Sequence, residues 1–225
     1  VAQARAIAPA TPVHHIFDIP SSLVEPDPAR AAAVRERLGI PSGGVVALYV
    51  GSFAVYQGID LLFQAIPPAL QKSPNLHIVI VGGSPAEIAA RQAEISTAGF
   101  AGRVLFPGHI HPDELPHTLA AADILLSPRI AGSNTPLKLL DYLKAGRAIV
   151  ACDNPANRLI LDESNARLVP PAPEAFADGL ATLAADAPLR ERLGATGRKL
   201  FLATYNYEQF KRRLGDVYRQ LLPTP

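Results

Sequence analysis

The sequence predicts an α/β protein built on a doubly wound, mostly parallel sheet of six strands. Two observations carry this prediction. Six short runs rich in Val and Ile show little alternation of apolar and polar residues, as strands buried on both faces do. Between several of these runs, apolar residues recur every three or four positions, which is typical of helices. Strands that alternate with helices form parallel units with right-handed crossovers, so we expect a Rossmann-like domain.

The expected strands, in chain order, are 45–50, 76–81, 103–106, 123–126, 148–151 and 166–169. Helical spacing covers residues 59–70, 115–122 and 137–144, and two further helical stretches, about 188–202 and 207–222, close the chain. Ser84 before Pro85 is expected to cap another helix. Pro67 and Pro68 fall inside the first helical segment, where we expect a kink or break because proline lacks a donor and clashes with the preceding turn.

Residues 1–43 do not continue this alternation, and we expect a lead-in segment there instead of a second domain. Within it, residues 13–19 are compatible with a strand. Residues 27–38 are compatible with a helix, which Gly39 would end.

The composition narrows the classes of protein that fit. The 225 residues suit one domain with flanking pieces, and 21 basic against 20 acidic residues give no reason to expect a nucleic-acid partner. The one cysteine, Cys152, excludes an internal disulfide framework. No apolar run approaches the ~20 residues that span a bilayer, and residues 1–20 lack the pattern of a signal peptide. We therefore expect a cytoplasmic protein and, since the chain does not begin with Met, part of a longer one.

Loops that follow the strands hold the candidate site residues, because ligands of an open parallel sheet bind beyond the carboxyl ends of its strands. The first such loop contains Gly51, Ser52, Gln57 and Gly58. Its glycines allow close approach of a ligand, and the helix that follows offers free N–H groups to an anion. A plain turn explains the loop equally well. The sequence holds neither the glycine fingerprint of dinucleotide enzymes nor a P-loop, which argues against both classes.

The second and third loops offer weaker signals. Gly82 and Gly83 leave room for a flat ligand, although turn formation alone accounts for them. His109 and His111 flank Ile110, but two loop histidines without a third ligand nearby do not predict a metal site. The main chain at His109 and Ile110 is instead a candidate for contacting the edge of a base.

The fourth loop is the most informative. Thr135 and Pro136 are the expected N-cap and first residue of a helix of roughly ten residues that ends at Gly146. The positive end of this helix would face the ligand side and favour a diphosphate. Lys138 in the first turn opposes the helix dipole, a conflict that a bound anion removes; the alternative is a solvated lysine. Asp141 lies among leucines, where it is either exposed or an acceptor for hydroxyl groups such as those of a ribose.

The order and spacing of these motifs resemble a known family. The motifs are Tyr49-Val50-Gly51-Ser52-Phe53 with Gln57-Gly58, Val81-Gly82-Gly83, Phe106-Pro107-Gly108-His109, Ala122-Asp123-Ile124-Leu125-Leu126-Ser127-Pro128, Thr135-Pro136-Leu137-Lys138 with Asp141, and Ala145-Gly146-Arg147-Ala148-Ile149-Val150-Ala151. Residues 45–218 resemble the C-terminal domain of family-4 (group 1) glycosyltransferases, which have the GT-B fold. The resemblance implies that the enzyme transfers a sugar, with retention of anomeric configuration, from a nucleoside-diphosphate sugar to a glycan, lipid-linked or small-molecule acceptor.

The resemblance also assigns residues. The family usually carries two acidic residues with seven between them; the second, which holds the ribose, maps to Asp141, whereas the first falls on Ser133, a departure from the pattern. Ser52 and Gln57 stand where the family often has Arg and Lys, so Lys138 would carry more of the phosphate charge. We expect Lys138 and Asp141 to be catalytic. The donor would bind Gly51, Ser52, Gln57, Gly58, Gly82, Gly83, His109, Ile110, Arg129, Ser133, Asn134, Thr135, Pro136, Leu137, Lys138 and Asp141.

The resemblance divides the chain as well. Residues 1–43 would be a lead-in or interdomain segment, 44–205 the nucleotide-sugar-binding domain, and 206–225 a helix that packs toward an N-terminal acceptor-binding domain. The implied partners are a nucleotide-sugar donor and that domain, without nucleic acid, metal or cofactor. Membrane contact is expected only through the full-length protein, at the inner face of the membrane. The isolated chain is expected to bind donor without completing a reaction.

Three alternatives remain open. A sugar-nucleotide epimerase of the same architecture would need a histidine and further carboxylates in the cleft; His109 is available, but no partner for it is evident. A non-catalytic domain that has lost its donor is supported by Ser133 at a position the family keeps acidic. An oxidoreductase is disfavoured for want of the glycine fingerprint.

Overall fold

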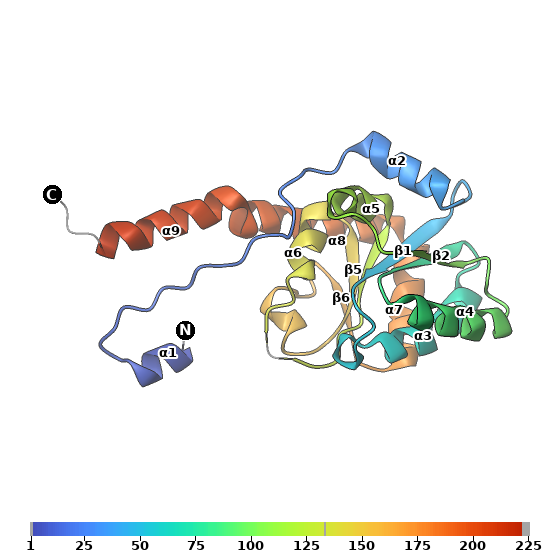
Figure 1. The fold of residues 1–225 in the computed structure, drawn as a ribbon, viewed down its shortest axis with the longest axis horizontal. Coiled ribbons are helices and arrows are strands. Elements are labelled where there is room, and N and C mark those ends of the chain that lie inside the picture. Colours follow the sequence, from blue (N-terminus) through green and yellow to red (C-terminus); the bar gives the residue numbers. More distant parts are fainter. Residues whose placement is uncertain (1, 133, 222–225) are drawn as a thin grey trace.

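The structure, a computed structural model, describes residues 2–132 and 134–221. Within that part the chain forms a six-stranded sheet of order β3-β2-β1-β4-β5-β6, in which every pair of neighbours is parallel (Figure 1). The strands are β1 (Val45–Val50), β2 (Leu76–Val81), β3 (Val104–Gly108), β4 (Ile124–Ser127), β5 (Ala148–Cys152) and β6 (Arg167–Val169). The predicted doubly wound sheet is therefore confirmed, with strand ends that differ by at most two residues. The chain order reverses between β1 and β4, which makes this pair the topological switch point.

Helices cover both faces of the sheet. One apolar core lies under α3 (Ile59–Lys72), α4 (Pro85–Thr97) and α7 (Pro173–Ala185); the other lies under α5 (Leu115–Ala121) and α6 (Lys138–Ala145). Within β1, Ala47 and Tyr49 point into the first core, whereas Val46 and Leu48 point into the second. Both faces of the strand are thus apolar, which explains why its sequence shows no alternation. The spacing analysis did not identify α7.

The expected break at the two prolines of α3 is absent. The helix runs without interruption from Ile59 to Lys72 and contains Pro67 and Pro68. Its inner side, which includes Leu62 and Ile66, is fully buried against the sheet. Burial of this side outweighs the loss of two N–H donors, as tertiary packing often does for local propensity.

The lead-in segment contains α1 (Ala2–Ile7) and α2 (Pro28–Arg37). The α2 helix was predicted: Asp27 caps its first amide groups, and Gly39, with a φ of 66°, follows its end. The strand expected at 13–19 does not form. These residues run away from the sheet (Figure 1), so their N–H and C=O groups have no neighbouring strand to pair with. Phe17 packs against Tyr205 instead, with ring centroids 5.4 Å apart.

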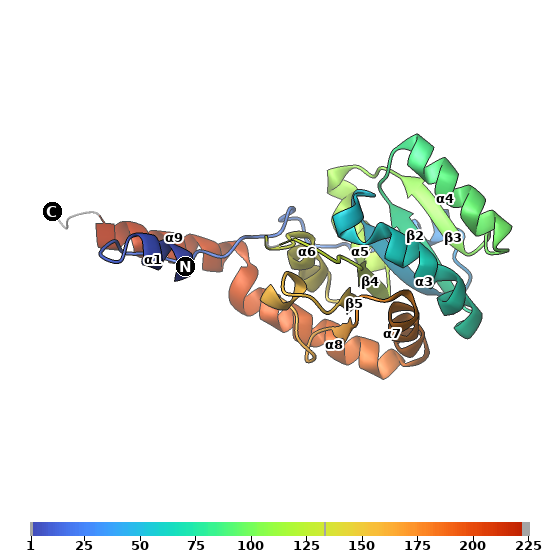
Figure 2. The ribbon, with the colours of Figure 1, turned by 90° about the horizontal axis from the view of Figure 1, so that it is seen from below.

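The chain ends in α8 (Ala187–Leu200), a π-helical turn η4 (Phe201–Tyr205) and α9 (Tyr207–Leu221), close to the two helical stretches that were predicted. Figures 1 and 2 show α9 extending away from the sheet on the same side as the N-terminal segment. None of the described side chains of α9 is buried. No helix in residues 2–132 and 134–221 is both long and apolar enough to cross a membrane.

Candidate functional site

A cavity of about 830 Å³ opens at the carboxyl ends of β1, β2 and β3, beside the switch point. The predicted site residues on its wall are Gly51, Ser52, Gly82, Gly83, His109 and Ile110. Most of the rest of the wall is apolar and includes Phe53 and Leu115. The structure thus brings together the first three loops that the sequence identified. A mostly apolar pocket with a few polar groups is typical of small-molecule sites.

Two glycines hold these loops close together. Gly82 has a φ of 112°, and a Cβ atom there would lie 2.1 Å from the carbonyl oxygen of Gly51. Gly58 has a φ of 72°, and a Cβ atom there would lie 1.9 Å from the carbonyl oxygen of Pro128, in the fourth loop. A side chain at either position would push two loops apart. The glycines are therefore needed for contact between loops, whatever they do for a ligand.

Two cationic side chains lie at the switch point. Lys138 Nζ donates a hydrogen bond to the carbonyl oxygen of Val50 (3.3 Å) and lies 4.7 Å from the ring centroid of Tyr49. Burial, with a smaller contribution from the positive charge of Arg129, lowers the pKa of Lys138 to about 8. A lysine whose charge is disfavoured in this way would gain from a bound anion.

Arg129 is almost completely buried, with 3% of its surface exposed. Its guanidinium donates to the carbonyl oxygen of Ala131 (2.8 Å) and to Oδ1 of Asn134 (2.6 Å). In the part of the chain that the structure describes, neither Arg129 nor Lys138 forms an ion pair with a carboxylate. Buried charges in proteins are normally paired. Both side chains are therefore candidates for contact with a negatively charged ligand.

The start of α6 differs from the prediction. The helix has eight residues and begins at Lys138, with Leu137 at the N-cap position and no capping hydrogen bond from a side chain. Thr135 and Pro136 are therefore not the N-cap and first residue. Leu137 already has helical angles, and the amide of Leu139 donates to the carbonyl oxygen of Pro136 (2.9 Å). A tight turn of the main chain thus replaces the expected cap. Gly146, with a φ of 66°, ends the helix as predicted.

Asp141 is buried, with 7% of its surface exposed, and accepts two hydrogen bonds from Ser21. Ser21 donates its main-chain N–H to Oδ1 (3.1 Å) and its hydroxyl to Oδ2 (2.8 Å). Burial raises the pKa of Asp141, and the bonds from Ser21 oppose this shift. Asp141 accepts a hydrogen bond from a hydroxyl group, as predicted, but in this structure the hydroxyl is that of Ser21. Asp141 is not among the residues that line the 830 Å³ cavity, whereas Ser21 is. No sequence pattern predicts this contact, because 120 positions separate the two residues.

The remaining predicted site residues are scattered around these groups. Gln57 is partly buried, and its Oε1 has no hydrogen-bond partner within the described residues. Asn134 is exposed, Thr135 is partly exposed and Leu137 is half-exposed. Ser133 lies outside the described residues. No group of three or more His, Cys, Asp or Glu in residues 2–132 and 134–221 has an arrangement that could hold a metal ion.

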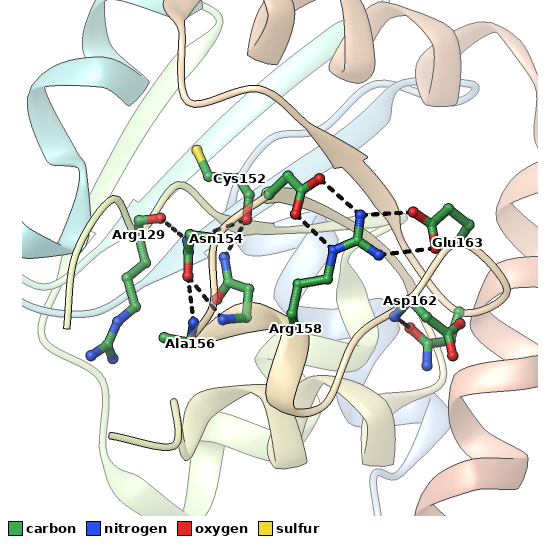
Figure 3. A network of polar contacts seen from close by, with 10 residues as sticks. Arg129, Cys152, Asn154, Ala156, Arg158, Asp162 and Glu163 are labelled. Carbon is green, nitrogen blue, oxygen red and sulfur yellow. Dashed lines mark hydrogen bonds and ion pairs between the residues drawn. The ribbon is translucent and has the colours of Figure 1, made fainter. Parts of the chain in front are cut away.

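One residue that the sequence analysis did not identify connects the fourth loop to the loop after β5 (Figure 3). Asn154 Nδ2 donates to the carbonyl oxygen of Arg129 (2.6 Å). Its Oδ1 accepts from the amides of Ala156 (2.9 Å) and Asn157 (3.0 Å). The main chain at Arg129 is therefore held by a side chain that is itself fixed at two further points.

The sequence and the fold were compared with known proteins. A family model described as glycosyl transferases group 1 matches residues 44–186, which is more than half of the chain. An alpha-D-kanosaminyltransferase of Streptomyces kanamyceticus is 28% identical over 222 residues, covering 96% of this chain and 56% of the relative. A phosphatidyl-myo-inositol mannosyltransferase of Mycobacterium tuberculosis is 30% identical over 166 residues, covering 71% of this chain and 43% of the relative. The chain spans about half the length of these curated relatives.

Solved structures agree with this match. The Anabaena protein HepE in complex with UDP and glucose superimposes with a TM-score of 0.77 at 17% identity, over 92% of this chain and 56% of that one. The C-terminal domain of a group 1 glycosyl transferase (LpcC) of Francisella tularensis gives a TM-score of 0.71 at 22% identity, over 84% of this chain and 99% of that one. The fold is therefore that of GT-B glycosyltransferases, as the resemblance implied. The chain belongs to the group 1 glycosyl transferase family.

Proposed function

We propose that the chain is the donor-binding part of a retaining glycosyltransferase and that its ligand is a nucleoside-diphosphate sugar. The observation that carries this proposal is the pair of cations, Arg129 and Lys138, which lie without a carboxylate partner, within the described residues, at the switch point of the sheet. A diphosphate would supply the negatively charged partner for these two side chains. Charge-assisted hydrogen bonds from Arg and Lys to phosphate are among the stronger polar contacts in proteins.

The cavity beside the cations supports a nucleoside in the rest of the site. Its mostly apolar wall, which includes Gly82, Gly83 and Ile110, suits the flat face of a base. Two neighbours show that related proteins use different bases. The solved HepE complex contains UDP, and a relative from Mycolicibacterium smegmatis is described as GDP-mannose-dependent.

In the proposed reaction the protein stabilises the charge of the leaving group and positions the donor sugar. When the glycosidic bond to the donor breaks, negative charge develops on the nucleoside diphosphate that leaves. Lys138 and Arg129 would stabilise that charge, and the loops would hold the sugar for the acceptor. We expect no metal or cofactor to be required, because the two side chains supply the positive charge. Retention of configuration and the choice of acceptor rest on the family resemblance.

The acceptor is proposed to bind another domain of the full-length protein. The chain spans about half the length of its curated relatives. The α9 helix leaves Leu221 and Tyr218 exposed and projects from the sheet domain (Figure 1). We propose that residues 206–225 pack toward that domain, and that the isolated chain binds donor without turnover.

Calorimetric titration of the chain with UDP, GDP and ADP tests the proposal. We expect one of the three nucleotides to bind, and Lys138→Ala to weaken its binding at least tenfold, as the loss of a charge-assisted contact predicts. Lys72→Ala is the matched control, because Lys72 lies on α3 and pairs with Asp178. The proposal would be overturned if no nucleotide bound, or if Lys138→Ala bound as tightly as the unaltered chain.

A further inference from the structure

Residues 20–24 of the lead-in segment, which we call the strap, cross α6 and are held there by two charged side chains of opposite sign. Asp141 accepts both hydrogen bonds from Ser21. One turn further along, Lys144 Nζ donates to the carbonyl oxygens of Ser22 (2.8 Å) and Val24 (2.6 Å). Residues three apart lie on the same face of a helix, so these contacts fix the strap along one side of α6.

The strap places Ser21 between Asp141 and the cavity. Ser21 is exposed and belongs to the wall of the 830 Å³ cavity. Asp141 is 7% exposed and faces a smaller pocket, on the side of Pro26 and Leu119. Both of its carboxylate oxygens are already engaged by Ser21. A ligand in the cavity would therefore meet Ser21 before it met Asp141.

Hydrogen-bond chemistry determines what Ser21 can offer to that ligand. An ionised carboxylate only accepts, so the hydroxyl hydrogen of Ser21 must point to Oδ2 of Asp141. The hydroxyl oxygen keeps acceptor capacity, and the negative charge of Asp141 polarises it. Ser21 Oγ is thus an acceptor on the cavity wall, and the complementary group on a ligand is a hydroxyl or N–H donor.

We propose that Ser21 contacts the nucleotide directly: its Oγ accepts a hydrogen bond from a hydroxyl group of the ribose. Asp141 then acts as a positioning residue that orients and polarises the Ser21 hydroxyl. This inference rests on the proposed donor-binding function and refines it, because it moves the ribose contact from Asp141 to a residue of the lead-in segment. The competing arrangement has the ribose displace Ser21 and bind Asp141 itself.

Ser21→Ala separates the two arrangements, because they predict changes of opposite direction. The substitution removes the hydroxyl but keeps the main-chain bond to Asp141 and both bonds from Lys144, so the strap keeps its other anchors. If Ser21 contacts the ribose, the variant binds more weakly. If the ribose must displace Ser21, the variant binds equally well or more tightly, because a competitor for Asp141 has been removed.

The experiment is calorimetric titration with UDP and GDP and with their 2′-deoxy and 3′-deoxy forms. We expect Ser21→Ala to weaken binding of the ribonucleotide about fivefold or more, the effect of one lost hydrogen bond. One of the two deoxy forms is expected to bind Ser21→Ala as well as it binds the unaltered chain. Ser21→Thr keeps a hydroxyl and is expected to restore discrimination. Ser22→Ala is the neighbouring control, since within the described residues the Ser22 hydroxyl has one hydrogen bond, which it accepts from the amide of Val24 (3.2 Å).

A double variant tests the positioning role of Asp141. If Asp141 acts through Ser21, Asp141→Asn adds little to the effect of Ser21→Ala on ribonucleotide binding. Unchanged or tighter binding by Ser21→Ala would overturn the inference, and so would fully additive effects in the double variant. The proposed function would survive either result, provided that the unaltered chain binds nucleotide and Lys138→Ala binds it at least tenfold more weakly. Absence of any binding by the unaltered chain would overturn both proposals.

Discussion

Lys138 Nζ lies 3.3 Å from the carbonyl oxygen of Val50, so the first residue of α6 contacts the last residue of β1. One turn further along α6, the hydroxyl of Tyr142 accepts from the amide of Val50 (3.4 Å) and donates to the carbonyl oxygen of Leu126 (3.2 Å). The hydrogen-bonded pairing of β1 with β4 ends before this point. Two side chains of α6 therefore replace the strand pairing where the sheet opens toward the ligand side.

Replacing Tyr142 with Phe is expected to lower the free energy of unfolding by about 1–3 kcal/mol, because two main-chain groups lose their partner inside the protein. Urea unfolding measures this change. Tyr218→Phe on α9 is the matched control, since Tyr218 is 57% exposed and its variant is expected to unfold like the unaltered chain. Equal stability of Tyr142→Phe and Tyr218→Phe would show that the phenol does not hold β1 and β4.

Nucleotide binding is expected to depend on pH because of Lys138. Its pKa is lowered to about 8 in the folded chain, mainly by burial. As the pH rises through about 8, the ammonium loses its proton and its attraction for a diphosphate. Affinity is therefore expected to fall between pH 7 and 9.5. A bound anion favours the charged form, so titrations near pH 8.5 in buffers of different ionisation enthalpy are expected to show proton uptake. Lys138→Gln, the control, is expected to lose both effects.

The same pKa has a consequence for stability. Because the pKa of Lys138 in the folded chain lies below its unfolded value of 10.5, the unfolded chain binds more protons between about pH 8 and 10.5. The contribution of Lys138 to the free energy of unfolding is therefore expected to rise with pH in that window. Urea unfolding of Lys138→Gln, compared with the unaltered chain at pH 7 and 9.5, isolates this contribution. A difference that stayed constant with pH would contradict the lowered pKa.

Asn154→Ala is expected to lower both the stability of the chain and its affinity for nucleotide, although Asn154 is not itself a proposed ligand contact. The substitution removes the bond to the carbonyl oxygen of Arg129 and leaves the amides of Ala156 and Asn157 without their acceptor (Figure 3). We expect a loss of about 1–3 kcal/mol in stability and weaker nucleotide binding. Arg158→Ala, four residues away, is the control. Its ion pairs are exposed, so a loss of at most about 1 kcal/mol and unchanged binding are expected. Equal losses in the two variants would show that the hydrogen bond from Asn154 does not hold the main chain of Arg129 in place.

The strands were predictable because both of their faces are buried. A strand such as Val45–Val50 is apolar on both faces and therefore appears in the sequence as a continuous apolar run. The helices between such strands bury one side, so their apolar residues recur every three or four positions. Two of the errors of secondary structure, at residues 13–19 and at Pro67, have a common cause. At 13–19 the local pattern was compatible with a strand, but no neighbour is present to pair with it; at Pro67 the local pattern predicted a break, but burial of α3 prevails. In both cases the deciding contacts lie far away in the sequence.

The sequence predicted which loops form the candidate site, but it did not predict the side-chain contacts within the site. Glycines after buried strands identified the cavity, and Lys138 was singled out because a cation opposes the dipole at that end of α6. The sequence could not reveal that Ser21 takes both oxygens of Asp141, since no pattern relates two residues so far apart. Asn154 was missed for a different reason: its role depends on a main-chain carbonyl group, which every residue has.

Gly58→Ala tests whether contact between the first and fourth loops shapes the site. A methyl group there would lie 1.9 Å from the carbonyl oxygen of Pro128, and the φ of 72° adds strain of about 1–2 kcal/mol. Gly99 has a similar φ of 82° but open space around it, so Gly99→Ala carries the strain without the contact. We expect urea unfolding to show a clearly larger loss for Gly58→Ala, and calorimetry to show weaker nucleotide binding in that variant alone. Because Arg129 directly follows Pro128, the clash reaches the cationic pair through one peptide bond. Equal behaviour of the two variants would mean that the fourth loop can retreat without disturbing Arg129.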